Sequence, residues 1–385
     1  SRATSSPVES NQCSGSKCRS TKSGVSNTGP PQSIRFAKTS RLAKGNCAKN
    51  SWSFIPESPD STGLVYPEEP AARSRWILQR RSEKNPLDPT RPYAWLLEKE
   101  RSAEGRLVDG LTIFLTNKEC PWRCLMCDLW QNTLNESVPA GAVVEQIDHA
   151  LGQAEKELGS LAKIHQVKLY NAGSFFDEKA IPSSEDEKIA KRLAKYERVI
   201  VECHPALVGE RCLRFNDTIP GKLEVALGLE TVHPEALAKL NKRVSLDDFS
   251  AAASLLKKNQ IDLRSFVLLQ PPFVLENESV EWAKRSVDFS IDCGASVSCI
   301  IPTRTGNGAM DTLAKAGKFH EPTLGQLEDA MDATIGSPNH RVFADLWDLK
   351  RFSKCPICFD ARRSRLEEIN NSQVPLDKID CVCCH

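Results

Sequence analysis

Residues 111–127 read LTIFLTNKECPWRCLMC, an apolar, strand-like run that leads directly into three cysteines. These cysteines, Cys120, Cys124 and Cys127, have the spacing C-x3-C-x2-C. A cubane 4Fe-4S cluster is usually held by four thiolates, so a loop with three leaves one iron open to another ligand. The alternative is a zinc site that a distant ligand completes. The position directly after a strand favours the iron-sulfur cluster.

Around this stretch, apolar runs alternate with amphipathic helical stretches as far as residue 301. The alternation predicts an α/β fold of repeated βα units with parallel strands, because right-handed crossovers leave few other arrangements. Six units give a partial, open TIM-like barrel, (βα)6, with its active site at the carboxyl ends of the strands. The expected strands are 111–116, 167–170, 199–202, 223–229, 263–269 and 297–301, and the expected helices 143–158, 185–196, 234–240, 246–259 and 280–291.

Composition divides the chain into four segments. Residues 1–70 are expected to be a disordered basic tail, since the first fifty hold nine Lys or Arg and one acidic residue. This tail could contact nucleic acid or be a solvated extension. A lead-in segment (71–110), the core domain (111–315) and a Cys-rich C-terminal extension (316–385) follow.

Size and hydropathy suggest a globular protein. The 385 residues are 40% hydrophobic and 26% charged, and no apolar run reaches the length of about 18 residues that a membrane span needs. No secretory signal is visible, so a soluble, cytoplasmic protein without membrane association is expected. The odd number of cysteines, 15, argues against a simple disulfide framework and favours metal binding.

The cysteine loop and its setting resemble the radical S-adenosylmethionine (SAM) superfamily, with a likeness that extends over about residues 85–313. The resemblance implies that SAM chelates the open iron of the cluster. Its reductive cleavage then releases methionine and a 5'-deoxyadenosyl radical, which abstracts hydrogen from a substrate. It also implies an electron donor such as flavodoxin or ferredoxin. The cofactor supplies this chemistry, and the protein supplies orientation and exclusion of water.

Further positions are carried over from the family one at a time. Asn171, Gly173 and Ser174 lie where the family often has a Gly-Gly-Glu run that contacts the methionine amino group of SAM. This chain lacks that glutamate, so Ser174 or backbone carbonyls are expected to make the contact. Glu202, at the end of a predicted strand, is expected to accept a hydrogen bond from a ribose hydroxyl. A strand-ending glycine and a solvated acid are the simpler interpretations of Gly173 and Glu202.

Three more candidates follow from the same resemblance. Glu230 lies in a segment that contacts the cofactor in elongator-type radical enzymes. Lys242 or Arg243, in the run Asn241-Lys242-Arg243, is expected to pair with the methionine carboxylate of SAM, although either could be a surface cation. Met126 stands where an aromatic residue commonly packs on adenine, and loop packing is the alternative.

Within the superfamily the chain resembles the elongator-like group, whose core domain is of the MiaB and NifB type. The particular likeness is to the radical subunit of archaeosine synthase, through segments 173–177, 202–205, 228–231 and 271–273. That group acts on tRNA, so RNA modification is a candidate function. Fold-level kinship does not transfer a substrate, and outside residues 1–50 the chain is acidic, which weakens the RNA interpretation.

A second metal site is predicted near the C-terminus. Cys355 and Cys358 form a C-x2-C knuckle, and Cys381 and Cys384 lie in a terminal cluster of cysteines. Thiolates suit either structural zinc or an auxiliary iron-sulfur cluster. A tail whose cysteines have no joint role is the alternative.

The favoured function is therefore that of a radical SAM enzyme with an unidentified substrate. The competing class is a non-catalytic iron-sulfur or zinc-binding protein, for instance an electron carrier or a nucleic-acid-binding module. An electron carrier would coordinate every iron and would need no polar groups at the strand ends.

Overall fold

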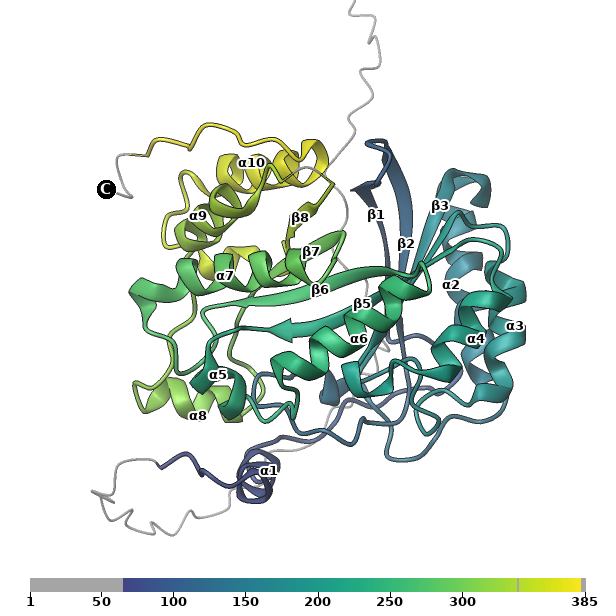
Figure 1. Cartoon of the computed structure of the whole chain (residues 1–385), viewed down its shortest axis with the longest axis horizontal. Coiled ribbons are helices and arrows are strands. Elements are labelled where there is room, and N and C mark those ends of the chain that lie inside the picture. The colour runs from purple at the N-terminus through teal and green to yellow at the C-terminus, as the bar shows by residue number, and fades with distance from the viewer. Residues whose placement is uncertain (1–64, 338, 382–385) are drawn as a thin grey trace, which may run out of the picture. The chain divides into compact units, whose positions relative to one another are not determined.

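The computed structural model describes residues 65–337 and 339–381, which form one eight-stranded sheet. Figure 1 shows helices around this sheet. The strands follow one another around the sheet in chain order. β1 pairs with β2 in antiparallel fashion, and every later neighbouring pair is parallel. The strands are β1 (Ala94–Arg101), β2 (Leu107–Leu115), β3 (Ile164–Asn171), β4 (Arg198–Cys203), β5 (Lys222–Glu230), β6 (Asp262–Leu269), β7 (Val297–Pro302) and β8 (Arg341–Ala344).

The described residues also form ten α-helices. They are α1 (Pro70–Leu78), α2 (Ala142–Leu158), α3 (Asp186–Leu193), α4 (Glu210–Thr218), α5 (Pro234–Lys239), α6 (Leu246–Lys258), α7 (Ser279–Asp292), α8 (Ala309–Lys315), α9 (Leu324–Thr334) and α10 (Phe359–Ser372). Local chemistry sets several ends: α6 begins at a capping box between Ser245 and Asp248, and α2 ends at Gly159, whose φ of 74° suits a residue without Cβ.

The predicted α/β partial barrel is confirmed, and the number of strands is corrected from six to eight. The six predicted strands correspond to β2–β7. The segment expected as a lead-in contains β1, which was not predicted because Glu98, Lys99 and Glu100 are charged. The segment expected as an extension contains β8, which pairs with β7 but has only four residues. The helices α1, α4, α8 and α9 were also missed.

Side chains alternate between the two faces of the strands. Leu111, Ile113, Leu115, Val167 and Leu169 are buried in the main apolar core that the helices cover. The intervening side chains fill the interior of the barrel-like sheet, where Phe114, Tyr170 and Phe266 meet edge to face, with ring centroids 6.2 and 5.9 Å apart. This aromatic layer separates the two ends of the interior.

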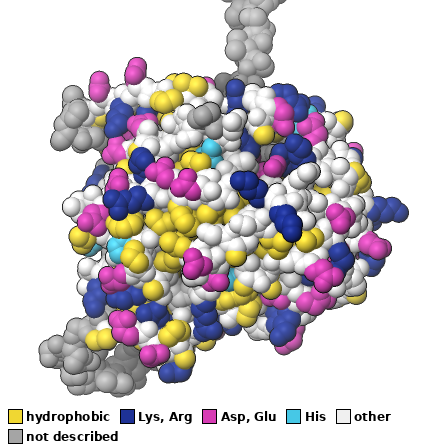
Figure 2. Space-filling view, in the orientation of Figure 1, with side chains coloured by type: hydrophobic (Ala, Val, Ile, Leu, Met, Phe, Trp, Pro, Cys, Tyr) yellow, Lys and Arg dark blue, Asp and Glu magenta, His cyan; other side chains and the backbone are white. Residues whose placement is uncertain are grey.

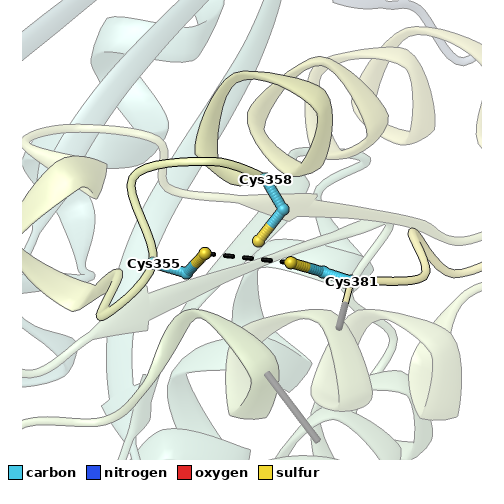
Figure 3. Close-up of side chains that lie close together, drawn as sticks. All are labelled: Cys355, Cys358 and Cys381. Atoms are coloured by element: carbon cyan, nitrogen blue, oxygen red, sulfur yellow. Dashed lines mark hydrogen bonds between the residues drawn. The ribbon is translucent and has the colours of Figure 1, made fainter. Parts of the chain in front are cut away.

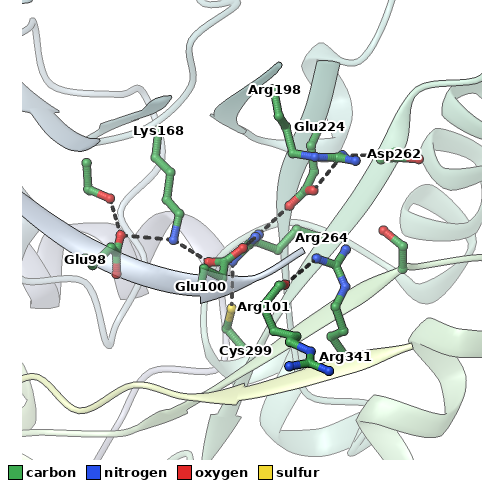
Figure 4. A network of polar contacts seen from close by, with 12 residues as sticks. Glu98, Glu100, Arg101, Lys168, Arg198, Glu224, Asp262, Arg264, Cys299 and Arg341 are labelled. Atoms are coloured by element: carbon green, nitrogen blue, oxygen red, sulfur yellow. Dashed lines mark hydrogen bonds and ion pairs between the residues drawn. The ribbon is translucent and has the colours of Figure 1, made fainter. Parts of the chain in front are cut away.

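The amino-terminal end of the interior holds a network of charges (Figure 4). Arg264 of β6 is buried and contacts Glu100 of β1 at 2.6 Å and Glu224 of β5 at 2.6 Å. Lys168 also pairs with Glu100, and Arg198 pairs with Glu224 at 3.0 Å. Because β1 and β6 are not neighbours in the sheet, these ion pairs run across the interior and connect its opposite sides.

Within the described residues β1 and β8 form no ladder, and α10 packs against both strands. Its amide side chains occupy the free edge of β8: Asn370 bonds to the N–H and C=O of Ala344, at 2.8 and 3.0 Å. Gln373, the next residue after the helix, does the same for Val342 at 2.8 and 2.9 Å. The unpaired backbone of an edge strand is thereby satisfied.

Two predictions fall partly outside the described residues. The basic tail lies there for residues 1–64, as does the predicted metal ligand Cys384. Among the helices of the described ranges, none combines the length and the apolar character that crossing a bilayer requires.

Candidate active site

The cysteine loop lies at the carboxyl end of β2, and residues from distant parts of the chain hold it in place. The Leu125 N–H donates to the Leu240 carbonyl at 2.9 Å, and the Asn241 amide donates to the Arg123 carbonyl at 2.7 Å. From beyond β7, the Asn307 amide donates to the carbonyls of Leu125 and Cys127 at 2.8 and 3.0 Å. The conformation of the loop therefore depends on the whole sheet.

The three thiols of the loop are half-buried and face one another closely enough for their charges to interact. Burial raises the pKa of all three thiols, to about 12 for Cys124. Metal coordination would displace these protons. Within the described chain, this trio is not among the groups whose ligand atoms all lie within 4.8 Å of one another. At least one pair of these sulfurs is therefore farther apart than the ligands of a single metal ion, as the larger 4Fe-4S cluster requires.

Gly173 lets the chain after β3 approach the loop. Its φ is 127°, and a Cβ at this position would lie 2.3 Å from the Cβ of Cys120. Any side chain here would displace that cysteine. Gly173, one of the predicted SAM-binding residues, therefore lies against the cysteine loop.

Glu230 and Lys242 form a buried ion pair beside the loop. Gly228 makes room for it, because a Cβ there would lie 1.9 Å from Lys242 Nζ and 2.2 Å from a Glu230 oxygen. Burial alone lowers the pKa of Lys242, but the charges of Glu230 and Cys124 outweigh burial and raise it. Arg243 is exposed instead and donates to Ser74 of α1 at 3.3 Å. Of the two predicted cations, Lys242 is the one that lies at the cysteine loop.

Glu202, the penultimate residue of β4, is half-buried close to the same groups. Burial raises the pKa of its carboxyl to about 8, although the positive charge of Lys242 and the Asn171 N–H act in the opposite direction. Lys242 is already paired with Glu230, so it compensates the second carboxylate incompletely. A carboxyl that titrates near neutral pH is common at functional sites.

Trp122, between the first two cysteines, stacks on His204, with ring centroids 3.6 Å apart and planes 9° apart. His204 Nδ1 accepts from the Ala206 N–H at 3.2 Å, so its Nε2 carries the proton and donates to the Lys242 carbonyl at 3.2 Å. Burial and the Lys242 charge lower the pKa of His204 to about 4. This neutral imidazole links the cysteine loop, the end of β4 and the Lys242 segment.

Several buried polar atoms at the carboxyl ends of the strands have no hydrogen-bond partner within the described chain. They are both amide atoms of Asn171, Oε1 of Gln270, and the hydroxyls of Thr116 and Thr303. Buried polar atoms are normally paired, so such a group around one end of a barrel is typical of a site for a polar ligand. The residues present therefore fit a bound cluster together with a polar molecule such as SAM.

Ser174 and Met126, which were also predicted to bind SAM, have other surroundings. The Ser174 hydroxyl contacts the Cys203 sulfur at 3.2 Å and accepts from the His204 N–H at 3.3 Å, so it is already engaged. Met126 is half-buried and does not belong to the apolar clusters of the described residues. A role in binding SAM stays a prediction for both.

Sequence reasoning missed Trp122, Asn307, Gln270 and Thr303 as members of this site. A signal was available for the last three, since each directly follows a predicted strand or lies in the turn beyond it. The sequence contains no such signal for Trp122, because its partner His204 is 82 residues away in the chain.

Comparison with known proteins gives the following relatives. No known family model matches the chain. An uncharacterised protein of Methanocaldococcus jannaschii is 24% identical over 335 residues, covering 81% of this chain and 88% of the relative. Archaeosine synthase subunit beta of Methanosarcina acetivorans is 25% identical over 300 residues, 72% and 85% of the two chains. The subunit of that name from Thermococcus kodakarensis is 29% identical over 229 residues, 58% and 69%.

Solved structures with a similar fold include radical SAM enzymes. Methylornithine synthase matches with a TM-score of 0.46 and 16% identity, covering 80% of this chain and 78% of that one. The archaeal Elp3 of Methanocaldococcus infernus matches with a TM-score of 0.42 and 14% identity, 52% and 51%. The tryptophan-binding methyltransferase TsrM of Kitasatospora setae matches with 0.39 and 17%, and this chain spans 38% of its length.

The predicted resemblance to the radical SAM superfamily is confirmed as a likeness, since the chain matches such enzymes and carries the three-cysteine loop at the carboxyl end of β2. The predicted likeness to archaeosine synthase is confirmed as well, since two of the sequence relatives are subunit beta of that enzyme.

Proposed function

We propose that the chain cleaves SAM reductively to provide a 5'-deoxyadenosyl radical for hydrogen abstraction, and that it acts on RNA. The observation that supports this proposal best is the placement of Cys120, Cys124 and Cys127 beside unpartnered polar atoms at the carboxyl ends of the strands. When bound by the three thiolates, a 4Fe-4S cluster would supply the electron for SAM cleavage. A low-potential donor such as flavodoxin or ferredoxin is the proposed source of that electron.

The residues of the chain have proposed roles in holding SAM. Lys242 supplies the positive charge for its carboxylate and is kept in position by Glu230. The unpartnered amide of Asn171 and the carboxyl of Glu202 are placed to accept from or donate to its amino and ribose groups. The Trp122–His204 stack shields one side of the cysteine loop.

The RNA target rests on the relatives named archaeosine synthase subunit beta. On the face of the molecule in Figure 2, Lys and Arg side chains are interspersed with Asp and Glu, so this face has no extended patch of positive charge. The strongest concentration of positive charge is in residues 1–50 of the sequence. We therefore propose that this segment contributes the electrostatic attraction to RNA.

The first experiment tests SAM cleavage. Protein reconstituted anaerobically with iron and sulfide, then given SAM and dithionite, should form 5'-deoxyadenosine and methionine in equal amounts. Cys124→Ser should form neither above background, because the cluster loses one of its three ligands. The matched control is Cys293→Ser, whose sulfur lies 3.4 Å from Ser250, away from the cysteine loop. Cleavage that persists in Cys124→Ser, or is lost in both variants, contradicts the assignment.

The second experiment tests the RNA target separately. A tRNA fraction should co-purify with the full chain and increase deoxyadenosine formation, and deletion of residues 1–50 should weaken both effects. SAM cleavage without any response to tRNA would refute the RNA target and leave the cleavage reaction intact. Binding that does not change with salt concentration would also contradict an electrostatic contribution from this segment.

A further inference from the structure

A second group of thiols, none of which belongs to the cysteine loop, comes together in the structure (Figure 3). Cys355 and Cys358 lie in the turn before α10, and Cys381 lies near the end of the described chain. Their sulfur atoms are all within 4.8 Å of one another, and those of Cys355 and Cys381 are 3.8 Å apart. This distance is far longer than a disulfide bond of about 2.05 Å, so Cys355 and Cys381 are not joined by a disulfide.

The spacing of these sulfurs indicates the kind of metal. A zinc ion with Zn–S bonds of about 2.3 Å in a tetrahedron holds its sulfurs about 3.8 Å apart. The Cys355–Cys381 distance agrees with this value. The cysteine loop, by contrast, has its sulfurs too widely spread to form such a group. The second group therefore fits a single tetrahedral ion better than an iron-sulfur cluster.

Two of the three sulfurs have hydrogen-bond donors around them. The backbone N–H groups of Ile357 and Cys358 face the sulfur of Cys355, and the Arg362 guanidinium contacts that of Cys358. Cys355 and Cys358 are only 6% and 5% exposed although Ile357 between them is 75% exposed. The turn therefore directs both sulfurs inward, towards Cys381 (Figure 3).

The chain after α10 is held so that Cys381 returns to the start of that helix. Arg365, a buried residue of α10, donates to the carbonyls of Leu376 and Asp377 at 2.6 and 2.8 Å. Lys378 pairs with Asp329 of α9. These contacts bring together two segments that are 26 residues apart in the chain.

We propose that Cys355, Cys358 and Cys381 bind one zinc ion, which fixes α10 and the chain after it against the free edge of β8. These thiolates supply three of the four ligands of a tetrahedral zinc ion. Cys358 is the N-cap residue of α10, and Asn370 and Gln373 at the other end of that helix bond to β8. The ion therefore stabilises the packing of α10 against β8 and β1. This site does not depend on the proposed reaction.

The test uses full-length chain in which Cys120, Cys124 and Cys127 are all serine, so that the first site holds no iron. Metal analysis after purification should find about one zinc ion per chain and almost no iron. Adding Cys355→Ser and Cys358→Ser should reduce zinc to background, whereas adding Cys293→Ser should not change it. Zinc retained without Cys355 and Cys358, an iron-sulfide chromophore formed on reconstitution, or no metal at all would each overturn the proposal.

A second measurement covers the case in which the double variant does not fold. Cobalt exchanged for zinc in the triple-serine chain should give the visible absorption of tetrahedral cobalt bound to thiolates. Cys381→Ser, which changes only the end of the described chain, should weaken that absorption. Cobalt spectra without thiolate charge transfer would overturn the proposed ligands.

The structural role has its own readout. Removing zinc with a chelator should accelerate amide hydrogen exchange in 341–344 and 359–372 and leave 198–203 of β4 unchanged. Unchanged exchange in α10 after complete loss of zinc would overturn the role assigned to the ion.

Discussion

Glu100 and Glu202 are two glutamates inside the same barrel-like sheet, and their pKa values shift in opposite directions. Burial alone raises the pKa of both carboxyls. At the amino-terminal end, the charges of Arg264 and Lys168 overcome burial and hold the pKa of Glu100 well below its usual range. At the carboxyl end, the pKa of Glu202 rises to about 8, because Lys242 is shared with Glu230.

The two ends of the barrel interior therefore differ in whether their polar groups are paired. The ion pairs of Glu100, Lys168, Arg198, Glu224 and Arg264 at the amino-terminal end connect strands of the barrel. At the carboxyl end, buried polar atoms of Asn171, Gln270, Thr116 and Thr303 have no partner among the described residues. Paired charges belong to the folded structure, whereas unpaired groups are available to a ligand. The following predictions test this division, in order of decreasing expected effect.

Arg264→Met should destabilise the protein by about 3–5 kcal/mol, because it removes one partner from two buried carboxylates, Glu100 and Glu224. Chemical denaturation measures the change. The control is Arg285→Met, which removes an exposed ion pair with Glu281 and should cost less than about 1 kcal/mol. Equal costs for the two variants would show that the buried network does not stabilise the fold.

Gly173→Ala should cost about 1–3 kcal/mol and lower the iron content after reconstitution, because the new Cβ overlaps Cys120 and φ is positive. Gly152→Ala in α2, where the Cβ has open space, should be neutral or stabilising by up to about 1 kcal/mol. Iron content and unfolding free energy are measured for both. Normal iron content in Gly173→Ala would show that the loop tolerates displacement.

Glu202→Gln should make the protein more stable than wild type at high pH. The folded pKa of about 8 lies above the ordinary value of 4.5, so the folded state binds this proton more tightly than the unfolded state. The stability that Glu202 contributes is fully present below pH 4.5 and is lost as the pH rises through 8. Denaturation of metal-free protein should show a stability advantage of the variant that grows by about 1–2 kcal/mol from pH 5 to pH 9. If the difference in unfolding free energy between the variant and wild type did not change with pH, the Glu202 charge would be fully compensated in the folded protein, which contradicts this prediction.

Arg243→Ala should have the smallest effect, within about 0.5 kcal/mol of unfolding free energy and about twofold in SAM affinity, because this side chain is exposed. Lys242→Met should weaken SAM binding much more, since it removes the buried cation beside the cysteine loop. Calorimetric titration of reconstituted protein with SAM compares the two variants. If Arg243→Ala weakened SAM binding more than Lys242→Met, Arg243 and not Lys242 would be the cation that binds SAM.

The sequence predicted those parts of the molecule that local patterns encode. Alternating apolar runs located six of the eight strands and five of the helices, and the spacing of Cys120, Cys124 and Cys127 located the site. β1 escaped prediction because its Glu98 and Glu100 are typical of surface residues, yet Glu100 is buried against Arg264. β8 escaped because four residues are too few for a period to be visible.

The sequence by itself determined the order of βα units, the cysteine spacing and the presence of a second group of thiols, because each depends on neighbours in the chain. Only the tertiary structure decided that Lys242 rather than Arg243 lies at the site, that Asn307 holds the cysteine loop, and that Cys381 reaches Cys355. These contacts join residues 26 to 182 positions apart or depend on backbone turns, such as the φ of 61° at Arg243, that no local pattern specifies. Burial then determined which charges are paired and which stay available to a ligand.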